Sequence, residues 1–128
     1  MGLYSFLAVG IGAAMGAWLR WGLGAFLNPH LPALPLGTLA SNLVGGYLVG
    51  LAVAFFSHHP GLSPELRLFL ITGFLGGLTT FSTFSAEAVN LLSRDEFGWA
   101  LLHVTSHLAG SLLLTFLGML TVKAILKH

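Results

Sequence analysis

The sequence is poor in charge and has no cysteine. Asp, Glu, Lys and Arg together make up 7% of the 128 residues, whereas hydrophobic residues make up 55%. A soluble domain carries about 25% charged residues, so this composition indicates an integral membrane protein. The missing cysteines exclude a disulfide framework, a thiol nucleophile and a thiolate metal site. The formal net charge of +1 gives no electrostatic basis for binding nucleic acid.

The few charged residues and the turn signals divide the chain into four apolar segments, each long enough to cross a hydrocarbon core of about 30 Å. Proline-rich or polar turns separate the segments, and Ser63 followed by Pro64 is typical of a helix start. We therefore predict a single domain over residues 1–128, an all-α integral membrane protein with four transmembrane helices in a lipid bilayer. The expected helices are residues 4–27, 36–57, 65–92 and 97–125.

The third segment contains residues that are unusual in the middle of a membrane helix. Residues 68–86 are uncharged and apolar, yet paired glycines and a run of hydroxyl residues interrupt them. Irregular backbone in a bilayer is tolerated only where protein, water or an ion satisfies its polar groups. The pattern predicts a helix broken near Gly76 and Gly77 and facing a site. A helix packed closely on a neighbour through its glycines is the alternative, but packing does not call for the hydroxyl residues Thr79, Thr80, Ser82, Thr83 and Ser85.

Polar side chains recur in the second and fourth segments. Asn42 lies mid-depth in the second segment, where an unpaired amide is costly, so it either lines a pore or makes an interhelical hydrogen bond. In the fourth segment polar residues recur every four positions, which places them on one helix face. That stripe predicts the wall of a wet pathway or a seam against another polar helix. Its members are His103, His107, Ser111 and Thr115.

The histidines and two charged residues allow more than one interpretation. Two histidines four residues apart can bind a metal, but no carboxylate or thiol lies near them in the sequence, which favours a pair of histidines near the membrane interface. Arg20, set between tryptophans, is expected at the interface, reaching lipid headgroups or a vestibule. Glu87 is expected either to pair with a basic group such as Arg20 or to cap the second half of the broken helix.

Small residues and the distribution of charge bear on packing and topology. The GxxxG pairs Gly12/Gly16 and Gly46/Gly50 indicate ordinary tight helix packing.

Four spans place both termini on one side of the membrane, and that side holds three Lys or Arg residues against two on the other. Such a small bias lets the chain insert in either orientation. An antiparallel pair of chains is therefore reasonable, since four helices alone hardly enclose a pathway.

Residues 73–87, GFLGGLTTFSTFSAE, resemble the signature of the Fluc (CrcB-type) fluoride channels. The stretches at residues 16–21, 37–39 and 42–47 are similar to that family too, and the resemblance covers essentially the whole chain in order. It implies a dual-topology antiparallel homodimer in the bacterial inner (plasma) membrane. It also implies two fluoride pores and a central sodium ion at the dimer interface.

The resemblance also implies roles for individual residues. Backbone carbonyls of Gly76 and Thr79 from both subunits would hold the sodium ion, for which hard oxygen ligands are suitable. Phe81 and Phe84 would face fluoride with their electropositive ring edges, and Asn42 would donate its amide N–H. The chain departs from the family pattern in its fourth segment, where an aromatic or small hydroxyl residue is expected at the two histidine positions. The other implied positions are the hydroxyl cluster Thr80, Ser82 and Thr83, the polar track Ser111 and Thr115, the vestibule residue Arg20, and Glu87 close to the pore.

The function that the resemblance implies is passive, selective conduction of fluoride, which protects the cell from fluoride toxicity and involves no enzymatic reaction. Fluoride is strongly hydrated, so its pore must replace water with N–H, O–H and ring-edge contacts. The alternative is a small proton-coupled multidrug exporter of dual topology, which needs a carboxylate within the membrane. The first segment has none, and Glu87 alone is a poor candidate. A non-transporting assembly protein would leave the hydroxyl cluster and the polar stripe unexplained.

Overall fold

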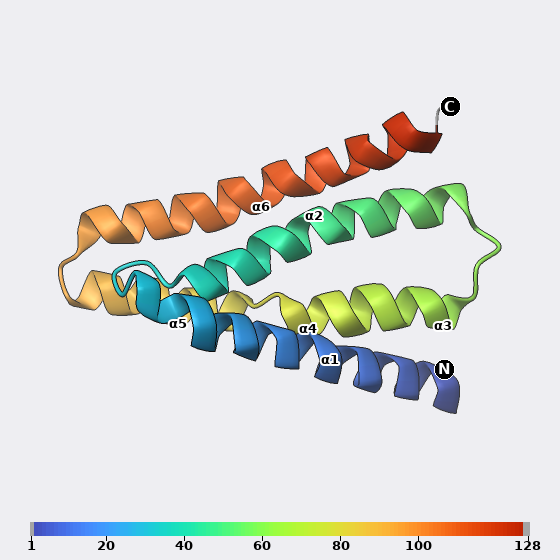
Figure 1. Cartoon of the computed structure of the whole chain (residues 1–128), viewed down its shortest axis with the longest axis horizontal. Helices are drawn as coiled ribbons and strands as arrows, with labels where there is room; N and C mark the ends of the chain where they lie inside the picture. The colour runs from blue at the N-terminus through green and yellow to red at the C-terminus, as the bar shows by residue number, and fades with distance from the viewer. Residues whose placement is uncertain (1, 127–128) are drawn as a thin grey trace.

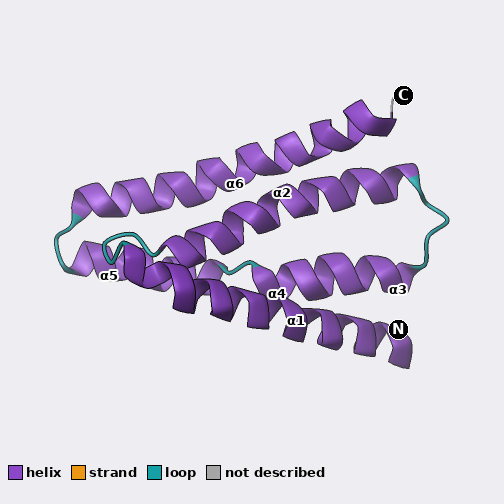
Figure 2. Cartoon of the chain, in the orientation of Figure 1, coloured by secondary structure: helices purple, strands orange, loops and turns teal. Residues whose placement is uncertain are grey.

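The computed structural model describes residues 2–126, which form helices joined by short connections (Figures 1 and 2). The expected spans and the observed helical stretches differ by no more than one residue at either end. The elements in chain order are α1 (Leu3–Leu27), η1 (Asn28–His30), α2 (Leu36–His58), α3 (Pro64–Arg67), η2 (Leu68–Leu75), α4 (Gly76–Leu78), α5 (Phe81–Ser93) and α6 (Phe97–Leu126).

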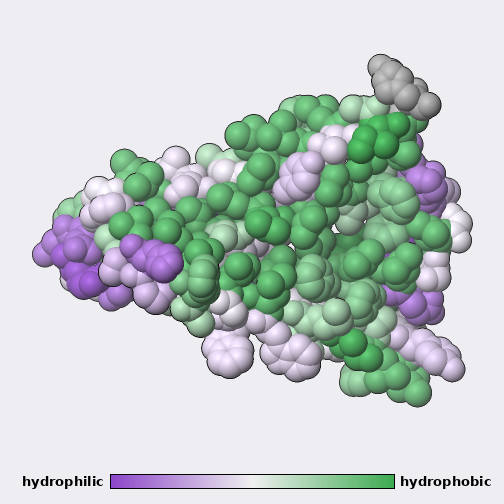
Figure 3. All heavy atoms as spheres, in the orientation of Figure 1, coloured by the Kyte–Doolittle hydropathy of each residue, from purple (hydrophilic) through white to green (hydrophobic). Residues whose placement is uncertain are grey.

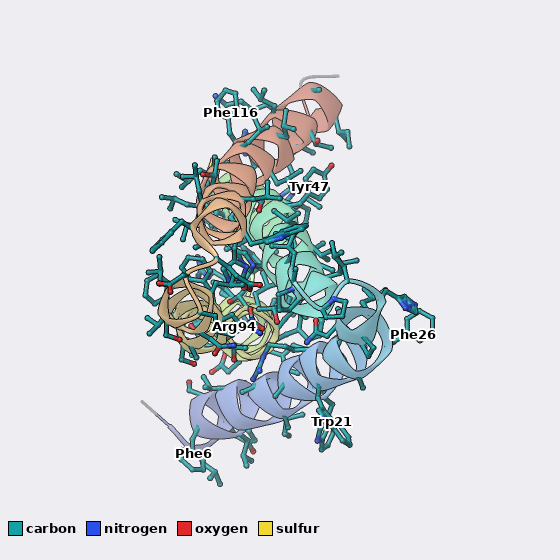
Figure 4. The ribbon with its side chains drawn as sticks, turned by 90° about the vertical axis from the view of Figure 1, so that its left-hand side faces the viewer. Phe6, Trp21, Phe26, Tyr47, Arg94 and Phe116 are labelled. Carbon is teal, nitrogen blue, oxygen red and sulfur yellow. The ribbon has the colours of Figure 1, made fainter. Side chains whose placement is uncertain are left out.

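Four stretches are long and apolar enough to cross a membrane, as the sequence predicts. They are Leu3–His30, Leu36–His58, Pro64–Ser93 and Phe97–Leu126. Hydrophobic side chains cover the middle of the face seen in Figure 3, and hydrophilic ones gather at its two ends. Figure 4 shows Trp21, Phe26 and Phe116 pointing away from the other helices, as suits side chains in contact with lipid. Both chain ends and the α2–α3 connection lie at one end of the molecule (Figure 1).

Side-chain oxygens define two of the helix starts. Ser63 caps α3 by accepting a hydrogen bond from the backbone N–H of Leu66 at 3.2 Å, and Pro64 occupies the first turn. The predicted helix start is therefore confirmed. Pro35 precedes α2 and offers no capping side chain. Asn28 takes that role from the preceding turn, because its Oδ1 accepts from the N–H groups of Gly37 at 2.6 Å and Thr38 at 3.3 Å.

Two close helix pairs build the bundle, α1 against η2 and α4, and α2 against α6. Glycines make both approaches possible. A Cβ added at Gly12 or Gly16 would meet backbone atoms of η2 or α4, and one added at Gly46 or Gly50 would meet the backbone of α6. The interpretation of both GxxxG pairs as tight packing is confirmed.

The third stretch leaves helical geometry at Thr79 and Thr80. Thr79 has φ −86° and ψ 153°, and Thr80 has φ −147° and ψ 120°, both extended. Figure 2 shows this interruption as a short non-helical connection between α4 and α5. The extended residues thus begin two positions after Gly77, close to the predicted position, and the glycines themselves are not extended: Gly76 keeps helical torsions and Gly77 packs against α1, where a Cβ would lie 3.0 Å from the nitrogen of Ala17. The preceding element η2, which α4 separates from the interruption, has π-helical hydrogen bonding.

Candidate functional site

An open groove of about 660 Å³ lies beside the interruption at Thr79 and Thr80. It is bounded by α2, by the residues around the interruption and by α6, so it brings together polar residues predicted from three separate segments. The predicted site residues that line it are Asn42, Gly76, Thr79, Thr80, Phe81, Phe84, His107 and Ser111. The other lining residues are mostly aliphatic. The few polar side chains, Asn42, Thr79, Thr80, His107 and Ser111, therefore dominate what the groove can bind.

Asn42 replaces the hydrogen bonds that the extended backbone of Thr80 lacks. Its Oδ1 accepts from the N–H of Thr80 at 2.8 Å, and its Nδ2 donates to the carbonyl oxygen of Thr80 at 3.0 Å. The same Nδ2 lies 2.9 Å from Nδ1 of His107. Asn42 therefore makes the interhelical hydrogen bonds that one alternative predicted, and it also borders the groove.

A second, smaller pocket of about 350 Å³ lies around Arg20. The Nε of Arg20 donates to the carbonyl oxygen of Gly77 at 3.0 Å. This carbonyl is available because the extended residues prevent the helical bond that Phe81 would otherwise make to it. Arg20 thus reaches into the protein rather than toward lipid headgroups. The pocket is lined by Arg20, Trp21, Gly24, Ala25, Asn28, Thr38, Thr80 and Thr83, so Thr80 borders both cavities.

Glu87 makes different contacts from those expected. Its Oε2 accepts a hydrogen bond from Oγ1 of Thr38 at 2.7 Å, and its Oε1 lies 3.6 Å from Nε2 of His103. The predicted pairing with a basic residue is met by His103 and not by Arg20, whereas the predicted capping role was wrong. Glu87 lies nearly two turns beyond the start of α5, where α2 and α6 approach it. The cap of α5 is Thr80, whose Oγ1 accepts from the N–H of Thr83 at 3.1 Å.

The two histidines are buried against α5. His103 is 0% exposed and stacks on Phe84 with ring centroids 5.2 Å apart, and His107 is 4% exposed with its centroid 4.8 Å from Phe84. Their burial differs from the expected pair of histidines near the membrane interface. One ligand-type atom from each of Glu87, His103 and His107 lies within 4.8 Å of the others. The expectation that no carboxylate is near the histidines was wrong, since folding of α5 onto α6 brings Glu87 to them.

The C-terminal part of the polar stripe on α6, Ser111 and Thr115, packs against α2. Thr115 donates through Oγ1 to the carbonyl oxygen of Gly46 at 2.8 Å and to that of Ser111 at 2.9 Å. The stripe therefore packs on α2 while His107 and Ser111 also border the groove. Near the interruption, Ser82 has its Oγ 3.4 Å from Oγ1 of Thr80. Thr79 donates through Oγ1 to the carbonyl oxygen of Leu75 at 2.8 Å.

Thr38 and Asn28 are site residues that sequence reasoning did not single out for a role. Thr38 is buried and holds Glu87, while Asn28 borders the Arg20 pocket and anchors the start of α2. Each carried a usable signal. A hydroxyl residue in the first turn of a membrane helix needs a partner, and an asparagine just after a helix is well placed to accept bonds from the next one.

Four apolar helices, and a mostly apolar groove that holds a few polar groups beside a helix interruption, define a small multi-pass membrane protein. The family model described as "CrcB-like protein, Camphor Resistance (CrcB)" matches residues 7–119, and the chain belongs to this family.

Curated relatives match it over nearly their whole length. The chain is 61% identical over 128 residues to a protein of Nitrosospira multiformis, with all of both chains covered. It is 66% identical over 123 residues to one of Cupriavidus pinatubonensis, covering 96% of this chain and 98% of the other. It is 65% identical over 119 residues to one of Ralstonia pickettii, covering 92% and 94%. Each of these relatives is named "Fluoride-specific ion channel FluC".

Proposed function

We propose that this chain is a fluoride-selective ion channel that lets fluoride leave the bacterial cell through the inner membrane and so protects against fluoride toxicity. The observation that carries the proposal is identity of 61–66% over nearly the whole chain to proteins named as fluoride-specific channels. The four apolar stretches supply the membrane context. Conduction makes and breaks no covalent bond, so the chain is not an enzyme.

The residues beside the interruption suit a small, strongly hydrated anion. Fluoride enters a protein only where its water is replaced by hydrogen-bond donors and electropositive edges. The hydroxyl groups of Thr80, Ser82 and Thr83 are such donors. The rings of Phe81 and Phe84, with centroids 5.5 Å apart, present edges that attract an anion. Arg20, in the pocket that Thr80 also borders, adds positive charge at a vestibule.

The third span acts, in this proposal, as a broken transmembrane helix within an antiparallel dual-topology homodimer. The extended torsions of Thr79 and Thr80 support the break. Two features support a second subunit: Phe81 is 79% exposed beside the open groove, and Gly76 is exposed next to it. An antiparallel partner would cover this face and complete two pores. The nearly equal Lys and Arg counts on the two sides are compatible with insertion in both orientations.

A sodium ion is the proposed structural cofactor at the dimer interface. Its ligands would be the backbone carbonyls of Gly76 and Thr79 from both subunits. The donor chemistry fits, because carbonyl oxygens are hard ligands and a helix break frees them from intrahelical hydrogen bonds. Both residues also line the groove on the face assigned to the partner. When bound, the ion would supply positive charge midway along the anion path.

The test is efflux of fluoride and chloride from liposomes that contain the purified protein, followed with ion-selective electrodes. Rapid fluoride loss with chloride retained is expected. Phe81→Ile and Phe84→Ile should slow fluoride efflux by at least about tenfold, the cost of losing one favourable ion contact. Phe26→Ile is the matched control, because Phe26 is 71% exposed and points away from the bundle (Figure 4).

A folded protein without fluoride efflux would overturn the proposal. The proton-coupled multidrug exporter would then be tested through Glu87→Gln, which should abolish proton-dependent transport if that alternative holds.

A further inference from the structure

The extended residues Thr79 and Thr80 leave the carbonyl groups of the preceding turn without their helical partners. In an α-helix, each carbonyl oxygen accepts a hydrogen bond from the N–H four positions later. Among residues 2–126, no backbone N–H donates to the carbonyl oxygens of Gly76, Gly77, Leu78 or Thr79. A carbonyl group without a donor is costly inside a membrane protein, so each of these oxygens requires another partner.

A side chain supplies that partner for one of the carbonyl groups. Nε of Arg20 donates to the oxygen of Gly77 at 3.0 Å, whereas no described residue donates to the oxygens of the other three. Of those three residues, Gly76 and Thr79 line the groove and Leu78 does not. The interruption therefore leaves unpaired carbonyl groups in two residues that border the groove.

Arg20 holds Gly77 on the side of α4 that faces α1. A Cβ at Gly77 would lie 3.0 Å from the nitrogen of Ala17, so α4 packs closely on α1 there. The groove lining includes Gly76 and Thr79 but not Arg20, and the pocket around Arg20 includes neither of those two residues. The hydrogen bond thus takes one released carbonyl toward α1, away from the two groove residues.

We propose that Arg20 is a positioning residue for a sodium site: by binding the carbonyl oxygen of Gly77, it fixes the turn whose remaining carbonyls, those of Gly76 and Thr79, receive the ion. The inference rests on the sodium cofactor of the proposed function and deepens it. The peptide unit that begins at Gly77 lies between the two ligand carbonyls, so its rotation would also turn them. Groups that bond behind metal ligands orient those ligands and raise their affinity.

The charge of Arg20 and its hydrogen bond act on a cation in opposite directions. Like charges repel, so the guanidinium by itself would weaken a sodium site nearby. Among the described residues only Nε of Arg20 makes a hydrogen bond, which leaves the terminal N–H groups free for the vestibule role proposed above. Removing the charge and removing the hydrogen bond should therefore change sodium binding with opposite signs.

Sodium binding to the purified protein, in chloride salts without fluoride, tests the proposal. Sodium chloride replaces choline chloride at constant ionic strength while thermal unfolding is followed, because an ion bound only by the folded protein raises its melting temperature. Sodium retained after gel filtration in choline chloride is measured by flame photometry, which also detects an ion that does not exchange. We expect sodium to stabilise the unaltered protein or to be retained by it.

Arg20→Met and Arg20→Gln form a matched pair of variants. Both remove the charge, and both place an atom at the same number of bonds from Cα as Nε of arginine, but only the amide nitrogen of glutamine donates. Arg20→Met should lose the retained sodium or raise the half-saturating sodium concentration by about tenfold or more. Arg20→Gln should bind sodium as the unaltered protein does. Arg94→Gln, in a side chain that is 53% exposed, is the control for removing a positive charge.

A dimer with one Arg20→Met subunit and one unaltered subunit, isolated through two affinity tags, is measured in the same way. It keeps half of the site intact if the fully altered protein does not fold, and its sodium binding should be weakened. Size-exclusion chromatography checks that each variant is folded.

Four results would count against the inference. Unchanged sodium binding in Arg20→Met, alone or in the mixed dimer, would overturn it. Tighter binding in both Arg20→Met and Arg20→Gln would show that Arg20 acts only by repulsion, and equal loss in both would refute the role of the hydrogen bond. Neither stabilisation nor retention of sodium in the unaltered protein would overturn the inference together with the sodium cofactor. If sodium binds as expected but no fluoride is conducted, the proposed conduction fails and the role of Arg20 remains.

Discussion

Gly16→Ala should destabilise the protein although alanine is the better helix former. A Cβ on Gly16 would press on the carbonyl oxygen of Phe74, lie 2.7 Å from the nitrogen of Leu78 and lie 3.0 Å from the carbonyl carbon of Phe74. All of these are backbone atoms, so no side chain is able to turn aside and α1 must move away from η2 and α4. Gly10 and Gly22 on the same helix are matched controls, because a Cβ at either meets nothing within 4 Å among the described residues.

The two kinds of site differ in the sign of the expected effect. Overpacking a close contact costs about 1–3 kcal/mol, and rigid backbone neighbours favour the upper part of that range. Replacing glycine by alanine in a helix gains up to about 1 kcal/mol. Gly16→Ala is therefore expected to lose about 1–2 kcal/mol, whereas Gly10→Ala and Gly22→Ala should be neutral or slightly stabilised.

Thermal unfolding in one detergent, followed by size-exclusion chromatography, measures this difference. The melting temperature of Gly16→Ala should fall by several degrees relative to both controls. Fluoride efflux should fall as well, because Gly16 contacts the residues directly before the interruption, and Arg20 lies one turn further along α1. Equal melting temperatures for Gly16→Ala and the controls would refute the close-packing argument.

Two further predictions concern hydrogen bonds that hold the site. Thr38→Val keeps the shape of the side chain but leaves Oε2 of Glu87 without its 2.7 Å donor; a loss of about 1–3 kcal/mol in the free energy of unfolding is expected, and Thr38→Ser should retain most of the stability. Arg20→Met removes the donor to the carbonyl oxygen of Gly77 and should lower the melting temperature and fluoride efflux together, whereas Arg20→Gln, which still carries an N–H, should lose less. Unchanged melting of Thr38→Val or Arg20→Met would contradict the role given to that bond.

The spans were predictable because they depend on local properties. An apolar run of membrane length between charged or proline-rich turns has few alternatives to a spanning helix, and Ser63 with Pro64 marks a helix start through chemistry within one turn. The interruption was half predictable. Poor helix formers indicated irregular backbone in the third segment, but whether Gly77 bends the chain or packs against α1 depends on another helix.

Contacts between helices were predicted least well. A basic partner was expected for Glu87, but His103 was not identified as that partner, and Thr38, which donates a hydrogen bond to Glu87, was not assigned a role. Successive residues on a helix point about 100° apart, so a small rotation of one helix changes which side chains meet. One sequence contains no direct measure of that rotation.

By itself, then, the sequence determined the class of protein, the number of spans, their ends and the presence of a polar site in the third span, because hydrophobicity, length and capping act within one segment. Only the tertiary structure decided that Asn42 satisfies Thr80 and orients His107, and that Arg20 binds the carbonyl of Gly77. These are contacts between segments far apart in the chain. Their partners follow from how four helices pack and rotate against one another, since each freed backbone group takes whichever donor or acceptor the packing brings within reach.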